Sequence, residues 1–325
     1  MVPEMNAPKV SIIVLNYNGK RFLDDCFQSL AKVDYPNFEV VMVDNESMDE
    51  SVPYVSKNYK WVRVFRSGSN NGFAFGNNVG IKNTDGEYIF LLNNDTVCTP
   101  DFLNKVVQVA ESDPEVGIVG AVPIQLNLDI SQSKIVVPWE KDADRVASVA
   151  GAVMLIKRDI LRDIGLLDET YFLYWEDTEF CWRANLLGYK IMVANKSIVF
   201  HIENATGLPT KNKWVYQYIR NKIYTHIKLT GFSYILWVLF IEIIYSLGRI
   251  FLHPQFTFSI INAWLWNFTN LKSTLKKRKE IRSRKKMDDR ELIKLIAEHN
   301  KRDKIGREFF KKLENTFAEK KSYNQ

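Results

Sequence analysis

Two adjacent carboxylates, Glu176 and Asp177, follow an aromatic run and stand where a helical pattern begins. In that pattern Glu179 and Arg183 lie four residues apart, and Gly188 marks its end. A carboxylate at a helix start beneath aromatic rings is held rigidly and partly shielded from water, which suits a general base. Neighbouring helix residues point in different directions, so we expect one of the two to act. The alternative is that Asp177 only caps the helix.

The elements that must position these carboxylates follow from apolar runs that alternate with helical patterns. Short runs rich in β-branched residues indicate buried strands, and the helices between them favour a mainly parallel sheet with helices on both faces. Ligands of such α/β sheets bind beyond the carboxyl ends of the strands. We expect strands over residues 10–15, 38–43, 61–65, 87–92, 116–121 and 189–201, and helices over 49–59, 73–84 and 101–111.

Polar side chains follow four of these strands, at Asn16, Asp44, Asn70 and Asp95, so one edge of the sheet is predicted to be polar. A carboxylate there could hold a hard divalent cation, which would neutralise the charge of a nucleoside diphosphate. Asp95 in the LNNDT stretch is the candidate, and His201 at another strand end could be a second ligand. The alternatives are a simple Asn-Asn-Asp turn and a structural histidine.

Two further stretches could contact a nucleotide. VDNESMD, residues 43–49, places Asp44 where it can accept a hydrogen bond from a base or ribose, and a capped helix start is the alternative. In SNNGFAFGNNVG, residues 69–80, Gly72 and Gly76 allow the backbone to approach a ligand closely. This stretch is not the GxGxxG fingerprint, and no Walker A sequence occurs, which argues against a dehydrogenase and a P-loop kinase.

Taken in order, these motifs resemble the family 2 inverting glycosyltransferases of GT-A fold, particularly the bacterial rhamnosyltransferase and galactofuranosyltransferase types. The resemblance implies metal-dependent, inverting transfer from a nucleoside-diphosphate sugar, dTDP-rhamnose or a UDP-sugar, to a hydroxyl of a glycan or lipid-linked glycan. It covers about residues 9–205 and rests on SIIVLNYNG, VDNESMD, NNGFAFGNNVG, LLNNDT, GAVMLIKR, LLDETYFLYWEDTEFCWR and the late His201.

The resemblance also implies roles for single residues. Asp177 matches the family's catalytic base, and Asp95 matches the last position of its metal-binding motif. Asn93 stands where many relatives have Asp, so Mg²⁺ or Mn²⁺ would depend on Asp95, His201 and the diphosphate. The donor-binding residues implied are Asn16, Asn18, Asp44, Ser47, Asn71, Gly72, Asn77, Asn94, Gly151 and Ala152.

The chain of 325 residues is long enough for one large domain and an appendage. We expect a catalytic domain over residues 1–210 and a helical region over 211–325. Three widely spaced cysteines without a CxxC motif predict neither a disulfide framework nor a zinc site, and fit a reducing compartment. The first residues show no signal-peptide pattern.

The helical region holds an apolar segment, 232–252, long enough to cross a bilayer. Glu242 and Arg249 lie on one stripe of it and would be costly in hydrocarbon, so we expect burial of that stripe against protein or an in-plane position. A second apolar segment, 256–268, precedes the basic run 272–286, which has nine Lys or Arg against one Glu. These features predict a cytoplasmic enzyme held on the inner membrane face by anionic lipids.

Other interpretations stay open. The apolar segments could be core helices of a soluble domain or a homo-oligomer interface. A transferase with a polyprenyl phosphate acceptor would depend less on Asp177, because its nucleophile is already an anion. A nucleotide-sugar-binding or nucleic-acid-binding protein without turnover is a further alternative. The basic run follows two apolar segments, however, which favours a membrane and predicts no nucleic-acid partner.

Overall fold

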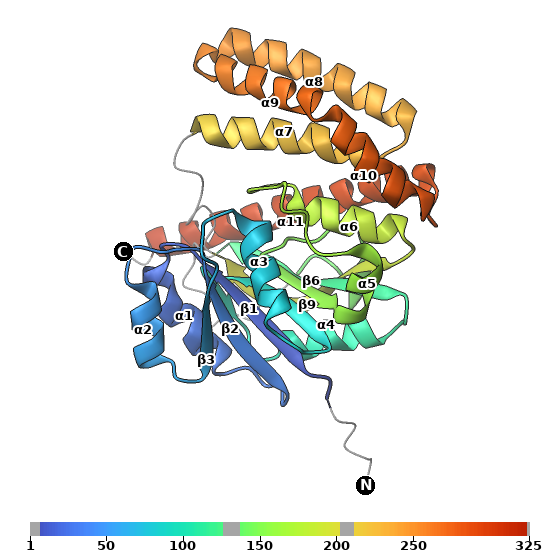
Figure 1. The fold of residues 1–325 in the computed structure, drawn as a ribbon. Coiled ribbons are helices and arrows are strands. Elements are labelled where there is room, and N and C mark those ends of the chain that lie inside the picture. Colours follow the sequence, from blue (N-terminus) through green and yellow to red (C-terminus); the bar gives the residue numbers. More distant parts are fainter. Residues whose placement is uncertain (1–6, 126–136, 202–210, 324–325) are drawn as a thin grey trace.

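The computed structural model describes residues 7–125, 137–201 and 211–323, with the side chains of the last helix described as far as residue 311. A β-sheet lies at the centre of the N-terminal part, with helices on both of its faces (Figure 1). Among the described residues the sheet has nine strands. They are β1 (Val10–Asn16), β2 (Phe38–Asp44), β3 (Val62–Arg66), β4 (Tyr88–Asn93), β5 (Thr96–Cys98), β6 (Val116–Gln125), β7 (Ala143–Arg145), β8 (Val153–Lys157) and β9 (Lys190–His201).

The strand order is β3-β2-β1-β4-β8-β6-β9-β5, and β7 pairs with β9. Strands β1 to β4 are mutually parallel where they pair, whereas β8 runs antiparallel to both of its neighbours, β4 and β6. The predicted α/β class of GT-A type is confirmed, and the sheet is more mixed than expected. A strand order that places β8 between β4 and β6 is decided by long-range pairing, which apolar runs alone do not encode.

The register of the parallel strands places their polar ends side by side. Asn16 of β1 pairs with Asp44 of β2, and Leu15 pairs with Asn93 of β4. Because each strand is an apolar run that ends at its first polar residues, burial of the runs in register carries those residues to one edge. Asn70 lies in the loop after β3 and does not belong to a strand end.

Successive residues of β1 pack on opposite faces of the sheet. Ile12 and Val14 belong to a core shared with α1 and α4, and Ile13 belongs to a second core shared with α3, α5 and α6. The helices of this part are α1 (Lys20–Leu30), α2 (Ser51–Asn58), α3 (Phe73–Lys82), α4 (Phe102–Glu111), α5 (Leu161–Ile164), which follows the 3₁₀ turn Arg158–Ile160, and α6 (Glu176–Leu186).

The chain after residue 210 is helical, as predicted. Helices α7, α8 and α9 stack together above the α/β part, α10 descends from them, and α11 crosses the α/β part itself (Figure 1). Leu292 and Ile296 of α11 share a core cluster with Trp182 and Leu186 of α6, so the helical region packs on the α/β part. The division at residue 210 remains a prediction. The helices are α7 (Lys211–Leu229), α8 (Phe232–Leu252), α9 (Thr257–Thr269), α10 (Leu271–Ser283) and α11 (Asp289–Tyr323).

Helix α8 buries its charged side and exposes its apolar side. Glu242 is 1% exposed, its carboxylate lies 2.6 Å from Lys222 Nζ of α7, and Arg249 is 3.7 Å away. Among the described helices, α8 is the one long and apolar enough to cross a membrane, with 22% of its most apolar window buried. Large apolar side chains on its outer side are exposed: Phe232, Leu236, Trp237, Phe240, Ile243, Ile244, Leu247, Phe251 and Leu252.

Candidate active site

A cavity of about 780 Å³ lies at the carboxyl ends of β1, β2 and β4. Its size is typical of a small-molecule site, with a mostly apolar lining and a few polar groups. Five of the polar lining residues are asparagines from strand ends and their loops: Asn18, Asn45, Asn70, Asn93 and Asn94. The remaining lining residues are Leu15, Tyr17, Gly72, Phe73, Phe172, Leu173, Lys213, Tyr216 and Gln217.

Asn16 is completely buried behind this polar edge and ties three strand ends together. Its Nδ2 donates to Asp44 Oδ1 over 2.9 Å and to Ser47 Oγ over 3.0 Å, and its Oδ1 accepts from Asn94 Nδ2 over 2.6 Å. Ser47 Oγ also accepts from the backbone N of Asn18 over 2.8 Å. Asn16, Asp44 and Ser47 therefore lie outside the cavity lining and orient Asn18 and Asn94, which belong to it.

The glycine-rich stretch contributes to the cavity through its first residues. Gly72 has φ +94°, and a Cβ there would lie 2.1 Å from the carbonyl oxygen of Phe172, so only glycine allows this approach. Asn71 is exposed and donates to Ser69 Oγ over 2.8 Å. Asn77 is buried within α3, where it donates to the carbonyl of Phe73 over 3.0 Å. Of the predicted donor-binding residues in this stretch, Gly72 lines the cavity and Asn71 and Asn77 do not.

The predicted metal ligands are neighbours across two paired strands. Thr96 of β5 pairs with His201 of β9, which brings His201 Nε2 to 3.2 Å from Asp95 Oδ1. Asp95 is 3% exposed, and no hydrogen bond reaches its Oδ1 among the described residues. Asn93 Nδ2 lies 3.3 Å from the same histidine nitrogen and lines the cavity.

A carboxylate oxygen without a donor beside an imidazole nitrogen fits a divalent cation. Within the described residues no three His, Cys, Asp or Glu side chains group into a metal site. Asp95 and His201 could therefore supply two ligands, and diphosphate oxygens or water would have to supply the others. The small number of protein ligands is usual for Mg²⁺, which is held largely by substrate phosphates and water, whereas an imidazole ligand is less usual for it.

Asp177 occupies the second position of α6, and its carboxylate is held at both oxygens. Oδ1 accepts from the backbone N of Thr178 over 2.6 Å, and Oδ2 accepts from the backbone N of Gly151 over 3.0 Å. A Cβ at Gly151 would lie 3.3 Å from the Asp177 Cβ and 3.0 Å from the ring of Phe73, a cavity residue. The next residue, Ala152, accepts from the backbone N of Asn93 over 3.1 Å. Gly151 and Ala152 thus lie between the predicted base and the polar edge.

Glu176 lies beside Asp177 but is more deeply buried, and one of its carboxylate oxygens has no partner in the described part of the chain. It is 5% exposed, and no hydrogen bond reaches its Oε2 within the described residues. Burial, with a smaller contribution from the charge of Asp177, raises the pKa of Glu176 to about 8. Near neutral pH Glu176 is therefore mostly a neutral acid.

This raised pKa predicts that stability decreases as the pH rises. Between the ordinary pKa of 4.5 and about 8, folded protein keeps a proton that unfolded protein has lost. The free energy of unfolding then falls by up to about 1.4 kcal/mol per pH unit. Glu176→Gln removes this titration, so its melting temperature should exceed that of the wild type by a margin that grows from pH 5 to pH 8. Glu87→Gln, at an exposed position, is the control. A margin independent of pH would contradict the prediction.

One wall of the cavity comes from outside the sequence motifs. Lys213, Tyr216 and Gln217 belong to α7, and they face Phe172 and Leu173 of the aromatic run before α6. The aromatic run before Glu176 could be recognised in the sequence as part of the site. The α7 residues follow no motif and lie 40 residues further along the chain than the run they face. Sequence reasoning therefore missed this wall.

The comparisons with solved structures agree on the fold. TarS of S. aureus in complex with UDP-GlcNAc matches with a TM-score of 0.53 and 19% identity, over 68% of this chain and 67% of that one. The mannosyltransferase PcManGT of Pyrobaculum calidifontis, in complex with GDP-Man and Mn²⁺, matches with a TM-score of 0.55 and 16% identity, over 91% of this chain and 88% of that one. The fold is that of the GT-A nucleotide-sugar transferases.

The sequence comparisons identify the family. Residues 11–130 match the model of Glycosyl transferase family 2, and residues 88–271, more than half of the chain, match that of Glycosyl transferase family group 2. The chain belongs to this family of glycosyltransferases, and the predicted resemblance to family 2 is confirmed at the level of the family.

Curated relatives include proteins of polysaccharide synthesis. The poly-beta-1,6-N-acetyl-D-glucosamine synthase of Staphylococcus epidermidis is 23% identical over 81% of this chain and 68% of its own length. The O-antigen biosynthesis protein RfbC of Myxococcus xanthus is 26% identical over 66% of this chain and 19% of its own length. The matched region thus covers very different fractions of the lengths of these relatives, and it covers 78% of the length of an uncharacterized glycosyltransferase of Haemophilus influenzae.

Proposed function

We propose that this glycosyltransferase moves a sugar, with inversion, from a nucleoside-diphosphate sugar to a hydroxyl of a glycan or lipid-linked glycan. The observation that carries the proposal is the position of the cavity. The cavity adjoins the Asp95–His201 pair through Asn93, and it adjoins Asp177 through Phe73 and Gly151. A cavity that adjoins both a candidate cation site and a carboxylate suits a donor that carries a diphosphate and a reactive sugar.

In the proposed reaction Asp177 accepts the proton of the acceptor hydroxyl while the oxygen of that hydroxyl forms a bond to the anomeric carbon of the donor sugar. The bond from that carbon to the diphosphate oxygen breaks, and the diphosphate leaves with the electron pair. The backbone N–H groups of Thr178 and Gly151 orient the Asp177 carboxylate. Attack opposite to the leaving group inverts the anomeric configuration in one step and needs no protein nucleophile.

Asp95 and His201 would hold Mg²⁺ or Mn²⁺, which stabilises the negative charge that develops on a departing diphosphate. Two solved structures of this fold were determined with Mn²⁺, PcManGT and GalNAc-T7, which supports the same use here. The amides of Asn18, Asn45 and Asn94 would bind the nucleotide, held in place by Asn16, Asp44 and Ser47.

A panel of UDP-, dTDP- and GDP-sugars tests the proposal. Thermal stabilisation with Mn²⁺ identifies the donor, because a ligand at 100 times its Kd adds about 2.7 kcal/mol to stability. Product analysis by NMR then gives the anomeric configuration. No stabilisation by any nucleotide sugar, or product with retained configuration, would reject the proposal in this form.

We propose further that α8 and α9 lie on the cytoplasmic face of a membrane, which suits a lipid-linked acceptor. The outer sides of these helices expose large apolar residues, while the charged stripe of α8 faces α7. Lys272, Lys276 and Lys279 of α10 are exposed beside them and would meet anionic head groups. Other cations of the basic run hold α10 on the protein: Lys277 contacts Asp168, and Arg282 contacts Asp289.

Vesicle sedimentation tests the membrane surface. Full-length protein should bind vesicles that contain anionic lipid, and the double variant Phe240→Glu/Leu247→Glu should bind at least tenfold more weakly. Each buried side chain of this size contributes about 1.5–3 kcal/mol. The control is Ile305→Glu, at a position of α11 that is 55% exposed, compared with 61% and 62% for the test positions.

Binding unaffected by the double variant would contradict this surface. Loss of a dimer in the same variant, without any vesicle binding by the wild type, would assign the surface to a second copy of the chain.

A further inference from the structure

The backbone just before α6 is strained. Tyr174 has φ +70° and Trp175 has φ +74°, and neither is a glycine. Left-handed backbone in two consecutive aromatic residues costs free energy, of order 1–3 kcal/mol each, and persists only where the surroundings hold it. The next two residues are Glu176 and Asp177, so this strained backbone sets the direction in which α6 begins.

Helix α7 supplies the groups that hold this segment. Asn221 Nδ2 donates to the carbonyl oxygens of Leu173 over 3.0 Å and Tyr174 over 2.7 Å. Arg220 Nη2 donates to the carbonyl oxygen of Thr170 over 2.7 Å. Three carbonyl oxygens of an irregular loop thus obtain their donors from two side chains, where a regular element would use its own backbone.

The two side chains also support each other. Arg220 Nε donates to Asn221 Oδ1 over 2.7 Å, so both the nitrogen and the oxygen of the Asn221 side-chain amide have partners. Asn221 is completely buried, and Arg220 is 7% exposed, with its guanidinium 4.7 Å from the ring of Trp266 in α9. Because these donors are fixed by packing, they define where the carbonyls of the loop must lie.

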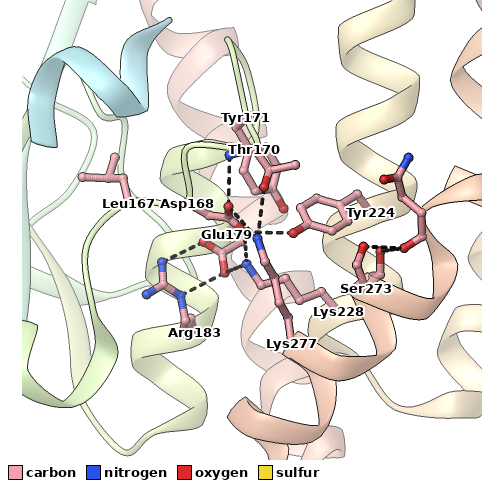
Figure 2. A network of polar contacts seen from close by, with 12 residues as sticks. Leu167, Asp168, Thr170, Tyr171, Glu179, Arg183, Tyr224, Lys228, Ser273 and Lys277 are labelled. Carbon is pink, nitrogen blue, oxygen red and sulfur yellow. Dashed lines mark hydrogen bonds and ion pairs between the residues drawn. The ribbon is translucent and has the colours of Figure 1, made fainter. Parts of the chain in front are cut away.

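Charged contacts on both sides of this loop, at Asp168 before it and at Glu179 after it, attach it to the helical region (Figure 2). Lys228 Nζ of α7 lies 2.6 Å from the carboxylate of Asp168 and 2.7 Å from that of Glu179 in α6. Lys277 of α10 also contacts Asp168 over 2.9 Å. Burial acts to raise the pKa of Asp168, but the two lysines outweigh it and hold that pKa below its ordinary value. Asp168 therefore stays charged and bound to both helices.

We infer that Asn221 is a positioning residue for the base: it holds Tyr174 and Trp175 in their left-handed backbone and thereby directs Asp177 toward Gly151. The inference rests on the proposed role of Asp177. The helical region is then part of the catalytic machinery, because it places the base as well as one wall of the cavity.

Hydrogen exchange on full-length protein without substrate tests the contact itself. In Asn221→Ala, amides of residues 173–178 should exchange at least tenfold faster than in the wild type. The control is Asn195→Ala, which removes a fully buried amide that donates to the carbonyl of Lys141 and to Asp144. The control should leave exchange in 173–178 unchanged. Unchanged exchange in Asn221→Ala would overturn the inference. If that variant does not fold, Asn221→Ser, which retains one donor, is measured in the same way.

A double-mutant comparison tests the consequence for turnover. Asn221→Ala should lower kcat about 10–100-fold with donor Kd within twofold of the wild type. In an Asp177→Asn background the same change should lower kcat less than threefold, because the group it positions is already gone. Equal losses in both backgrounds would overturn the inference and indicate a general structural role. Absence of transfer by the wild type would instead reject the proposed function, and the exchange measurement would still decide whether Asn221 holds the loop.

Discussion

Replacement of Asp177 by Asn is expected to leave donor binding intact and to slow transfer to a hydroxyl acceptor by about 10²–10⁴-fold. The amide keeps the size of the carboxylate, and its oxygen can still accept from Thr178 or Gly151, but it cannot take the acceptor proton. The measurement is turnover at saturating donor, together with donor Kd by calorimetry. Near-normal turnover in Asp177→Asn would remove Asp177 from the role of base.

Glu176→Gln is the matched control, because Gln resembles the neutral acid that Glu176 forms when burial raises its pKa to about 8. Its turnover at pH 7 should stay within about threefold of the wild type. A large loss there, with turnover retained in Asp177→Asn, would exchange the roles of the two residues. If Asp177→Asn retains turnover with a polyprenyl phosphate acceptor but not with a hydroxyl acceptor, the natural acceptor would be identified as an anion that needs no base.

Replacement of Asp95 by Ala is expected to weaken donor binding in Mn²⁺ by tenfold or more, about 1.4 kcal/mol, and to change it little in EDTA. The buried Asp95 Oδ1 forms no hydrogen bond among the described residues and lies 3.2 Å from His201 Nε2, so a cation bound by both groups would compensate its burial. The measurement is donor Kd for wild type and variant in both solutions. Equal affinity in Mn²⁺ and EDTA for both proteins would show that binding uses no metal.

His201→Ala should act in the same direction as Asp95→Ala but more weakly, because water can replace one neutral ligand. A further control is Asp163→Asn, at an exposed carboxylate outside the cavity. It should bind the donor like the wild type in both solutions. If Asp95→Ala, His201→Ala and Asp163→Asn all lose the gain in donor affinity that Mn²⁺ gives over EDTA, the loss would reflect a change in global stability.

Much of the polar edge of the sheet follows from local sequence. The apolar run that forms β1 ends at Asn16, and the run that forms β2 ends at Asp44. Parallel pairing in register then brings both ends to one edge, whatever the details of the loops. The helical pattern that begins at Glu176 and ends before Gly188, which has φ +96°, was predictable because helix periodicity and a glycine at a helix end are local features.

The cost of placing charge in hydrocarbon restricted the position of α8 in advance. A stripe that contains Glu242 and Arg249 was expected either to be buried against protein or to lie in the membrane plane, and the structure buries Glu242 against α7. The sequence did not identify Lys222 as the partner, because a contact between two helices depends on how they pack.

Within the site, the division of tasks among polar residues was decided by tertiary structure. Asn16 and Asn18 are equally polar and two residues apart, yet Asn16 is fully buried and Asn18 lines the cavity. Strand pairing places the Asn16 side chain against Asp44 and Asn94. The residues next to Asn16 in the sequence do not predict this orientation.

By itself, then, the sequence determined the family, the strand edge with its candidate carboxylates and the apolar helices, because these depend on residue type and local periodicity. Tertiary structure alone decided that α7 forms one wall of the cavity and that Asn221 donates hydrogen bonds to the carbonyl oxygens of Leu173 and Tyr174. The physical reason is that an irregular loop must find donors for its carbonyls wherever the packed chain offers them. Here the donors come from a helix that begins 37 residues after Tyr174, and no local pattern links the two.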